Sequence, residues 1–208
     1  MPRRAKETQN LQHGTWNLEP ETRTMILETI FSTLDEHGKP NFAPMGIVWG
    51  DDSVIVRPFR TSQTCRNLVS CGHGVANLSD NVLAFVQCAL YDEILPSFPA
   101  VKVPGVIFQD ACSWLELAVV AICGSEERAE FRCRVLHRGR QKDFLGFCRA
   151  RNAVVEAAIM ATRLRLHDRN RVVNFLNQYM NVVDKTGSEI EKQAFQLVCK
   201  YVEEQGEQ

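Results

Sequence analysis

The sequence lacks the short motifs that identify the common hydrolases. The patterns G-x-S-x-G, H-E-x-x-H and G-x-x-x-x-G-K-[ST] are all absent, and no pair of carboxylates stands at a recognisable acid–base spacing. These absences argue against serine hydrolases of the nucleophile-elbow type, zinc peptidases and P-loop nucleotide hydrolases. Chemistry in this chain, if it occurs, is therefore expected to depend on something other than a side-chain triad.

Long apolar runs and an excess of positive charge are also missing. The longest apolar run, residues 114–123, contains Glu116 and falls short of the ~20 residues needed to span a bilayer. The net charge is -1, which argues against nucleic acid as a partner because phosphate-backbone binding needs a positive excess. Residues 1–20 are polar with no apolar run behind Arg3 and Arg4, so we expect a flexible N-terminal arm, no membrane anchor and a cytoplasmic protein.

The eight cysteines stand singly and form no C-x-x-C pair. In a chain without a secretion signal this favours reduced, buried thiols that act as small hydrophobic residues. Cys65, Cys71 and His73 lie close in sequence, but their spacing matches no zinc knuckle, and we expect no metal.

What the sequence does contain is an ordinary globular composition, with 45% hydrophobic and 24% charged residues over 208 positions. That length fits one large domain or a core domain with an appendage, since domains are typically roughly 100–150 residues. Six segments read as strands and two as short helices. The strand-like segments are 25–33, 41–49, 53–59, 75–80, 114–123 and 129–138, and the helical ones are 62–69 and 82–90, the latter capped by Ser79 or Asp80. This order predicts a small barrel with helices at its openings.

From about residue 142 the apolar spacing becomes helical, which predicts three helices. Asp168 and Ser188 can cap the second and third of them, while Glu156 and Arg163 on the first are assigned to solvent. The predicted organisation is therefore an arm over 1–20, a barrel over 21–141 and a helical subdomain over 142–208.

The strongest local signal is the stretch Arg57-Pro58-Phe59-Arg60-Thr61-Ser62-Gln63-Thr64 at a strand-to-helix junction. Two guanidinium groups and three hydroxyls precede or open a short helix, where free backbone N–H groups and the helix dipole favour an anion. Arginine adds planar, bidentate donors that suit phosphate oxygens. The stretch predicts a phosphate site; a solvated polar turn is the alternative.

Two other residues, Pro44 and His73, are candidates for a functional site. Pro44 interrupts a strand-like segment, and because it cannot donate to a ladder it indicates an edge, a bulge or a place where a ligand replaces a strand partner. His73 stands between two glycines and is interpreted either as a turn residue or as a proton donor.

Taken together, these segments resemble an uncharacterised archaeal and bacterial family of flavin-reductase-like proteins that have the FMN-binding split β-barrel fold. The matching segments are 26–30, 38–41, 43–46, 57–61 with Thr64, 75–80 and 149–163. The resemblance spans roughly residues 25 to 205. It implies an α+β, mainly β fold, in which the split barrel carries a C-terminal helical subdomain.

The same resemblance implies a homodimer with FMN at the subunit interface. It assigns the FMN phosphate to Arg57, Arg60, Thr61 and Thr64. It places Asn41 and the segment Pro44, Met45 and Gly46 against the isoalloxazine ring, with Asn77 nearby; no catalytic side chain is assigned.

Three functions follow from this resemblance and stay open at the level of sequence. The first is an FMN-dependent oxidoreductase or flavin reductase that exchanges hydride with a nicotinamide or related donor. The second is an FMN-binding carrier or sensor without turnover. The third is a split-barrel scaffold that has lost flavin. A flavin enzyme needs few catalytic side chains, because the cofactor itself carries the hydride chemistry.

Overall fold

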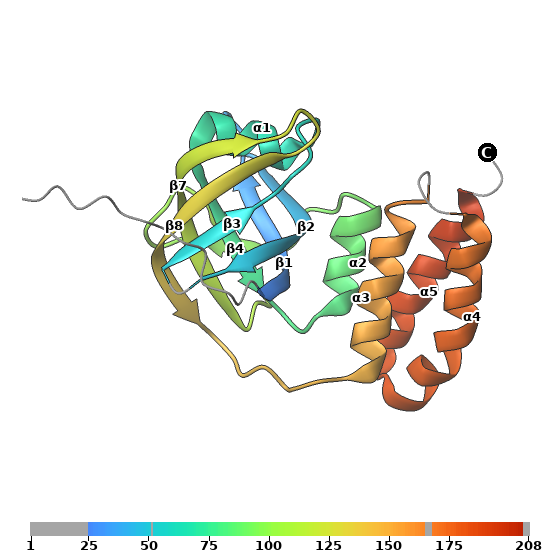
Figure 1. Ribbon diagram of the computed structural model, residues 1–208. Helices are drawn as coiled ribbons and strands as arrows, with labels where there is room; N and C mark the ends of the chain where they lie inside the picture. Colours follow the sequence, from blue (N-terminus) through green and yellow to red (C-terminus); the bar gives the residue numbers. More distant parts are fainter. Residues whose placement is uncertain (1–24, 51, 165–167, 206–208) are drawn as a thin grey trace, which may run out of the picture.

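A computed structural model describes residues 25–50, 52–164 and 168–205 of the chain. The proposed arm over residues 1–20 lies outside the described residues. Two parts stand side by side in Figure 1: a β-barrel and a group of helices. Three connections join them, one on each side of α2 and one from the last barrel strand to α3 (Figure 1).

Six antiparallel strands close into a barrel in the order β1-β2-β3-β8-β7-β4. Their bounds are β1 Met25–Leu34, β2 Pro40–Trp49, β3 Ser53–Val56, β4 His73–Leu78, β7 Ser113–Gly124 and β8 Ala129–Arg140. Alternating side chains fill the interior, because successive residues of a strand point to opposite faces. Phe31, Ile47 and Phe131 are among the buried residues of this barrel core.

Helix α1, Gln63–Cys71, contributes Cys65 and Leu68 to the barrel core. It contacts β1, β2 and β4, so it covers one opening of the barrel. Ser62 caps its N-terminus, accepting a hydrogen bond from the Cys65 backbone N–H at 3.2 Å, and Gly72 ends it in the left-handed conformation at φ 68°, which glycine adopts without a Cβ penalty.

The second part is a group of four helices: α2 Val82–Leu90, α3 Arg149–Ala161, α4 Arg169–Thr186 and α5 Glu189–Glu204. Asp168 and Ser188 cap α4 and α5, as the sequence predicts. The four helices share one apolar cluster, which Ile30 of β1 and Phe42 of β2 also join. The outer face of the barrel and the helices are thus packed on each other.

Three local predictions from sequence are corrected. Helix α2 is capped by Asn81, whose side chain accepts from the Ala84 backbone N–H, because Asp80 is engaged in ion pairs with Lys142 and Arg151. The strand predicted to reach Phe59 ends at Val56. The proline-rich stretch 96–104, for which the sequence predicts a loop, contains the strand β5, Ser97–Pro99, which pairs with β6, Val106–Phe108.

Among the described residues, no helix has the length and apolar character required to cross a membrane.

Candidate functional site

In the closed barrel, the pairing between β2 and β3 is incomplete and leaves an opening between these two strands. The two strands pair only through Ile47–Trp49 and Val54–Val56, whereas β2 pairs with β1 along its whole length. In the part of the chain that the structure describes, Pro40–Gly46 therefore has a strand partner on one side only. Pro44 lies on this half of β2, which agrees with the edge position expected of a residue that cannot donate to a ladder.

Across this opening lies the loop formed by residues 57–62. The loop leaves β2 and attaches instead to the turn between β7 and β8. The Arg60 backbone N–H donates to the Glu127 carbonyl at 3.0 Å, and the Ala129 N–H donates to the Pro58 carbonyl at 3.1 Å. Arg128 fixes the loop further, since its guanidinium lies 3.8 Å from the centre of the Phe59 ring and donates to the Arg57 carbonyl at 3.1 Å. Cation–π contacts and hydrogen bonds of this kind hold a loop in one conformation.

The four residues predicted to hold a phosphate are brought to this loop and to the start of α1. Arg57, Arg60 and Thr61 are exposed, whereas Thr64 is buried. Arg57 Nε pairs with Glu130 at 2.9 Å, and this hydrogen bond lowers the pKa of Glu130. Arg60 Nε donates to the Ser125 carbonyl at 2.7 Å. The first turn of α1 carries no acidic residue, so its dipole stays favourable for an anion.

The predicted ring-binding segment of β2 forms the other wall of the opening. Asn41 Nδ2 donates to Thr64 Oγ1 at 3.3 Å, a contact that spans the opening from β2 to α1. Met45 packs against the barrel core, and its carbonyl accepts from Thr29 Oγ1 at 2.9 Å. Pro44 and Gly46 alternate with Met45 and so point to the outer face. The opening is thus lined on one side by the backbone of β2 and on the other by the loop of residues 57–62, which we call the arginine loop.

Asn77 is fully buried on β4, where it lies opposite Ile30 of β1, the residue that in turn lies opposite Pro44. Its amide nitrogen donates to the Ile30 carbonyl at 2.9 Å and to Ser32 Oγ at 3.1 Å, and its oxygen accepts from the Phe108 N–H at 2.9 Å. The Asn77 amide therefore has hydrogen-bond partners on β1 and β6, as a buried amide group requires.

His73 follows α1, at the end of that helix opposite the arginine loop. Its Nδ1 lies 2.7 Å from the Cys71 carbonyl. All eight cysteines are free thiols, and burial raises the pKa of Cys88 and of Cys133 to about 12. No group of three or more metal-ligating side chains occurs among the residues that the structure describes.

The structure adds residues that the sequence did not indicate. Arg66 lies on the first turns of α1 and donates to the Thr61 carbonyl at 2.7 Å, and Arg128 holds the loop from the neighbouring hairpin. Glu28 of β1 lies opposite Gly46 of β2, next to the predicted ring-binding segment. Burial raises the pKa of Glu28, the Arg163 charge opposes that shift, and the Glu156 charge adds to it. These residues come from distant segments, so only the strand register and the packing of the helices reveal them.

Comparison with known proteins gives a consistent result. A family model described as "Protein of unknown function (DUF447) N-terminal domain" matches residues 27–142, and "Protein of unknown function (DUF447)" matches residues 148–200. The crystal structure of FMN-bound protein MM1853 from Methanosarcina mazei superposes with a TM-score of 0.75 at 25% identity, covering 86% of this chain and 96% of that one.

Two more distant solved structures were also found. The FMN-binding protein from Thermus thermophilus with bound p-hydroxybenzaldehyde matches at 16% identity and a TM-score of 0.48, covering 67% of this chain and 82% of that one. The 2-nitrobenzoate 2-nitroreductase NbaA from Pseudomonas fluorescens matches at 15% identity and a TM-score of 0.48, covering 55% and 64%. The fold expected from sequence, a split barrel of the FMN-binding, flavin-reductase-like type with C-terminal helices, is confirmed.

Proposed function

Because the chain belongs to the DUF447 family, whose two models match it over residues 27–142 and 148–200, we propose that it is an FMN-binding flavoprotein that acts as an oxidoreductase. The observation that carries this proposal is the opening between β2 and the arginine loop, in a fold shared with an FMN-bound member of the family. A bound flavin supplies the hydride chemistry itself, so the protein need contribute only binding, orientation and electrostatics.

The residues at the opening fit a flavin phosphate. Arg57, Arg60 and Thr61 offer cationic and hydroxyl donors on one exposed loop, and the start of α1 offers backbone N–H groups with no acidic residue in its first turn. Charge-assisted hydrogen bonds from arginine are the strongest ones available to a phosphate. Thr64, which is buried in the first turn of α1, adds a hydroxyl group that accepts a hydrogen bond from the Asn41 side-chain amide. Arg57 shares its charge with Glu130, so Arg60 is the stronger phosphate ligand of the two arginines.

The open half of β2 fits the flavin ring. Its backbone from Asn41 to Gly46 lacks a second strand partner among the described residues, so its N–H and C=O groups can bind the polar edge of a ring in place of a strand. The ring would lie along the open edge of the strand, because the Ile26 and Glu28 side chains already cover Gly46 on the outer face. Asn77 takes a supporting role, since it fixes the neighbouring strand β1 through the Ile30 carbonyl.

The proposal includes a homodimer with FMN at the subunit interface and a nicotinamide-type electron donor. Support comes from the split-barrel fold and from the open strand edge, which a second subunit and a ligand together would cover.

The test is a visible absorption spectrum of the purified protein, followed by anaerobic addition of NADH or NADPH. We expect flavin absorption bands that disappear on reduction by one of these donors. Bound FMN that neither donor reduces would favour a carrier or sensor. Failure to bind added FMN would indicate a scaffold that has lost flavin and would refute the proposal.

A further inference from the structure

The arginine loop is built against the neighbouring turn between β7 and β8, residues 125–128. The Arg60 backbone N–H donates to the Glu127 carbonyl at 3.0 Å. The Arg60 side chain ends on the same turn, because its Nε donates to the Ser125 carbonyl at 2.7 Å. Among the described residues, the loop has no such pairing with β2. The conformation of the loop therefore depends on this turn, which we call the β7–β8 turn.

Arg128 reaches from the β7–β8 turn to two residues of the loop. Its Cζ atom lies 3.8 Å from the centre of the Phe59 ring, and its Nη1 donates to the Arg57 carbonyl at 3.1 Å. The backbone of Arg128 also forms an isolated antiparallel bridge with Phe59. Its planar guanidinium can make both side-chain contacts at once, which a lysine ammonium cannot reproduce. Arg128 thus fixes the first half of the loop.

The β7–β8 turn is itself closed by short-range contacts. The Ser125 N–H donates to the Arg128 carbonyl at 2.9 Å, and the Arg128 N–H donates to Ser125 Oγ at 3.2 Å. Gly124 precedes the turn with a φ of 106°, in a region that residues with a Cβ atom rarely adopt. A Cβ atom there would lie 2.4 Å from the Arg128 carbonyl oxygen and 2.7 Å from the Glu130 nitrogen. The position of Arg128 therefore depends on glycine at residue 124.

The second half of the loop is held by α1. Arg66 Nη1 donates to the Thr61 carbonyl at 2.7 Å, and the Ser62 N–H donates to the Phe59 carbonyl at 3.0 Å. Both halves of the loop are thus anchored through backbone carbonyls. The side chains of Arg60 and Thr61, which lie between the anchors, remain exposed.

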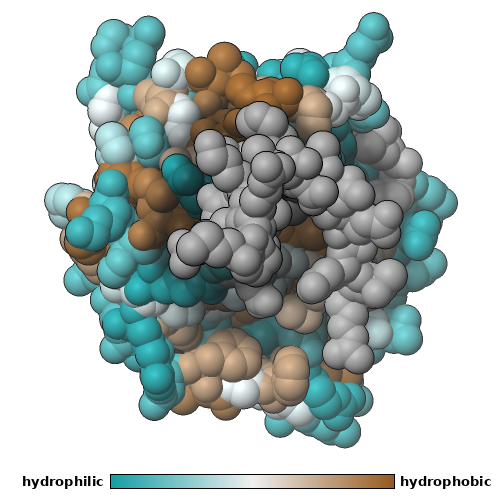
Figure 2. Space-filling view, turned by 60° about the vertical axis from the view of Figure 1, so that its left-hand side comes forward, coloured by the Kyte–Doolittle hydropathy of each residue, from teal (hydrophilic) through white to brown (hydrophobic). Residues whose placement is uncertain are grey.

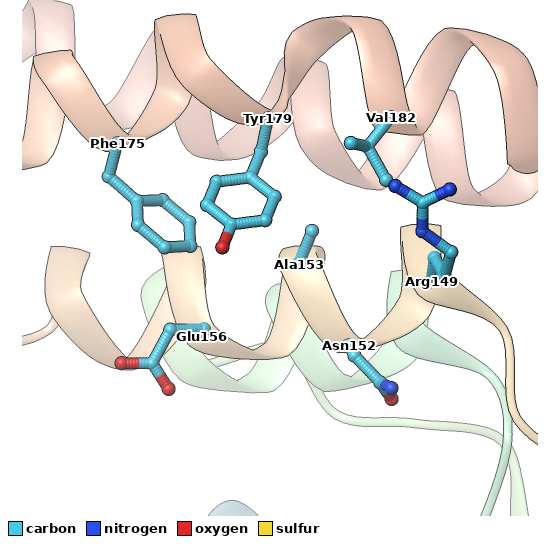
Figure 3. A pocket seen from close by; sticks show the side chains of 7 residues that line it. All are labelled: Arg149, Asn152, Ala153, Glu156, Phe175, Tyr179 and Val182. Carbon is cyan, nitrogen blue, oxygen red and sulfur yellow. The ribbon is translucent and has the colours of Figure 1, made fainter.

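No wall of the described grooves between the helices supports this loop. Figure 3 shows one of them, a groove of about 260 Å³ whose lining residues all belong to α3 and α4. It carries one charge of each sign, Arg149 and Glu156, so it does not favour an anion. A phosphate at the arginine loop would instead bind on an exposed surface. There the donors keep their positions only through contacts such as those of Arg128 and Arg66.

We propose that Arg128 is a positioning residue for phosphate binding, which holds the arginine loop so that Arg60 and Thr61 face one phosphate group. The proposal rests on the proposed function, because the phosphate is that of FMN. Donors that are already in place bind an anion more tightly, since the loop does not have to be ordered when the ligand binds. Loss of Arg128 should therefore weaken ligands that carry the phosphate and spare those that lack it.

The experiment titrates FMN and riboflavin into the full-length protein and into Arg128→Ala, with binding followed by calorimetry. We expect FMN to bind about tenfold more weakly to the variant and riboflavin to bind almost equally well. Arg128→Lys keeps the charge but not the planar fork, so FMN should stay weakened. Full recovery in Arg128→Lys would show that only the charge matters and would overturn the proposal. Arg134→Ala, which changes an exposed arginine of β8, is the control and should alter neither affinity.

A second variant displaces the turn without changing any charge. Gly124→Ala should shift Arg128 and weaken FMN but not riboflavin, because the new Cβ atom would meet the backbone of the turn. Gly146→Ala is the matched control. Gly146 also has a positive φ, 94°, but lies in the connection from β8 to α3, so its replacement should leave both affinities unchanged.

Backbone hydrogen exchange in the absence of ligand gives a readout that does not depend on flavin. The Arg60 and Ser62 amides are hydrogen-bonded within the loop and to the turn. They should exchange faster in Arg128→Ala and Gly124→Ala than in the unmodified protein, because the loop opens more often. Weaker FMN binding with unchanged exchange, or faster exchange with unchanged FMN binding, would overturn the positioning role.

The proposed function and the positioning role fail in different ways. If the unmodified protein binds neither flavin, the proposed function fails, and the same variants are titrated with inorganic phosphate. Weaker phosphate binding in Arg128→Ala and Gly124→Ala would then still support the positioning role, and absence of phosphate binding by the unmodified protein would overturn it. If FMN binds equally well to the unmodified protein and to both variants, flavin binding stands and the role of Arg128 is refuted.

Discussion

Arg57 and Arg60 lie on one loop, yet their surroundings give them different parts in anion binding. Arg57 is ion-paired with Glu130, which also binds Arg132 at 3.3 Å. The Nε atom of Arg60 donates to the Ser125 carbonyl oxygen at 2.7 Å. No carboxylate of the described residues forms an ion pair with Arg60. A phosphate would therefore gain more from Arg60 than from Arg57.

Replacement of Arg60 by alanine tests this difference. A charge-assisted hydrogen bond contributes roughly 1.5–3 kcal/mol, so Arg60→Ala should weaken FMN binding at least tenfold and leave riboflavin, which has no phosphate, nearly unchanged. Calorimetric titration of both ligands measures the two affinities. Arg171→Ala, on α4, is the control and should alter neither, and equal losses for the two ligands in Arg60→Ala would remove the phosphate assignment.

At the scale of elements, α2 belongs with the helices although the chain places it between two barrel strands. Its residues Ala84, Phe85 and Val86 lie in the same cluster as α3 and α5. A charged network ties these elements together: Arg151 of α3 donates to Glu191 of α5 at 2.9 Å and contacts Asp80, just before α2, at 3.3 Å. Glu191 also accepts from the Ser188 backbone N–H in a capping box. Breaking a buried pair of this kind typically destabilises a protein, because one charge is left without its partner.

The network predicts a specific loss of stability in acid. Burial alone would raise the pKa of Glu191, but hydrogen bonds from Ser188 and Arg151 outweigh it and lower the pKa from 4.5 to about 2. A carboxyl with a depressed folded-state pKa stabilises the protein above its unfolded pKa and loses that contribution as pH falls toward the folded value. The free energy of unfolding should therefore fall between about pH 4.5 and about pH 2.

Denaturant midpoints measured across this window, for the unmodified protein and for Glu191→Gln, isolate the effect. The variant should be less stable at pH 7, and the difference should shrink as the pH approaches 2. Glu189→Gln changes a glutamate whose side chain is 95% exposed and should follow the unmodified protein. A difference between Glu191→Gln and the unmodified protein that stays constant with pH would contradict the assignment.

At the scale of the whole molecule, the barrel has its own apolar interior, but Ile30 and Phe42 on its outer face belong to the apolar cluster of the helices, as does α2. Removal of residues after about 145 would expose Ile30, Phe42 and α2, which now lie in the helical cluster. Contiguous exposed apolar surface drives association. We therefore expect residues 20–142 alone to aggregate, as measured by size-exclusion chromatography, and co-expression of residues 143–208 to restore solubility. A soluble, dimeric and flavin-loaded fragment would show that the barrel is independent.

Exposed apolar side chains offer surface that could be buried in a dimer. Figure 2 shows apolar side chains among polar ones on one face of the molecule. Large exposed ones include Val120 and Ile122 of β7 and, between β8 and α3, Phe144, Leu145 and Phe147, the last of them 97% exposed. Together with the open edge of β2 they provide surface that a second copy could cover.

We expect a homodimer in solution. Light scattering at micromolar concentration should give about twice the chain mass of 23.6 kDa, whether or not FMN is added. A monomer under both conditions would remove the interface-bound flavin from the proposed function, although it would leave a flavin site on the single chain open to test.

The sequence by itself determined the elements and much of the candidate site. Alternating apolar residues predicted the six barrel strands, and helical spacing predicted α3, α4 and α5, because both patterns reflect local geometry that a short segment carries by itself. Asp168 and Ser188 were found as caps for the same reason. The stretch 57–64 could be proposed as a phosphate site because its arginines, its hydroxyls and the start of the helix are contiguous in sequence.

Only the tertiary structure decided how these pieces combine. The opening beside Pro44 exists because β3 ends at Val56 and the next residues attach to the β7–β8 turn, a choice among partners that no local pattern specifies. Asn77 was expected near a flavin ring from resemblance alone, and its burial with partners from β1 and β6 depends on strand order. Glu28 lies over Gly46 because the register of β1 and β2 pairs these two residues. Long-range pairing is set by the total burial of the fold, and for that reason the opening beside β2 could not be predicted from any one segment.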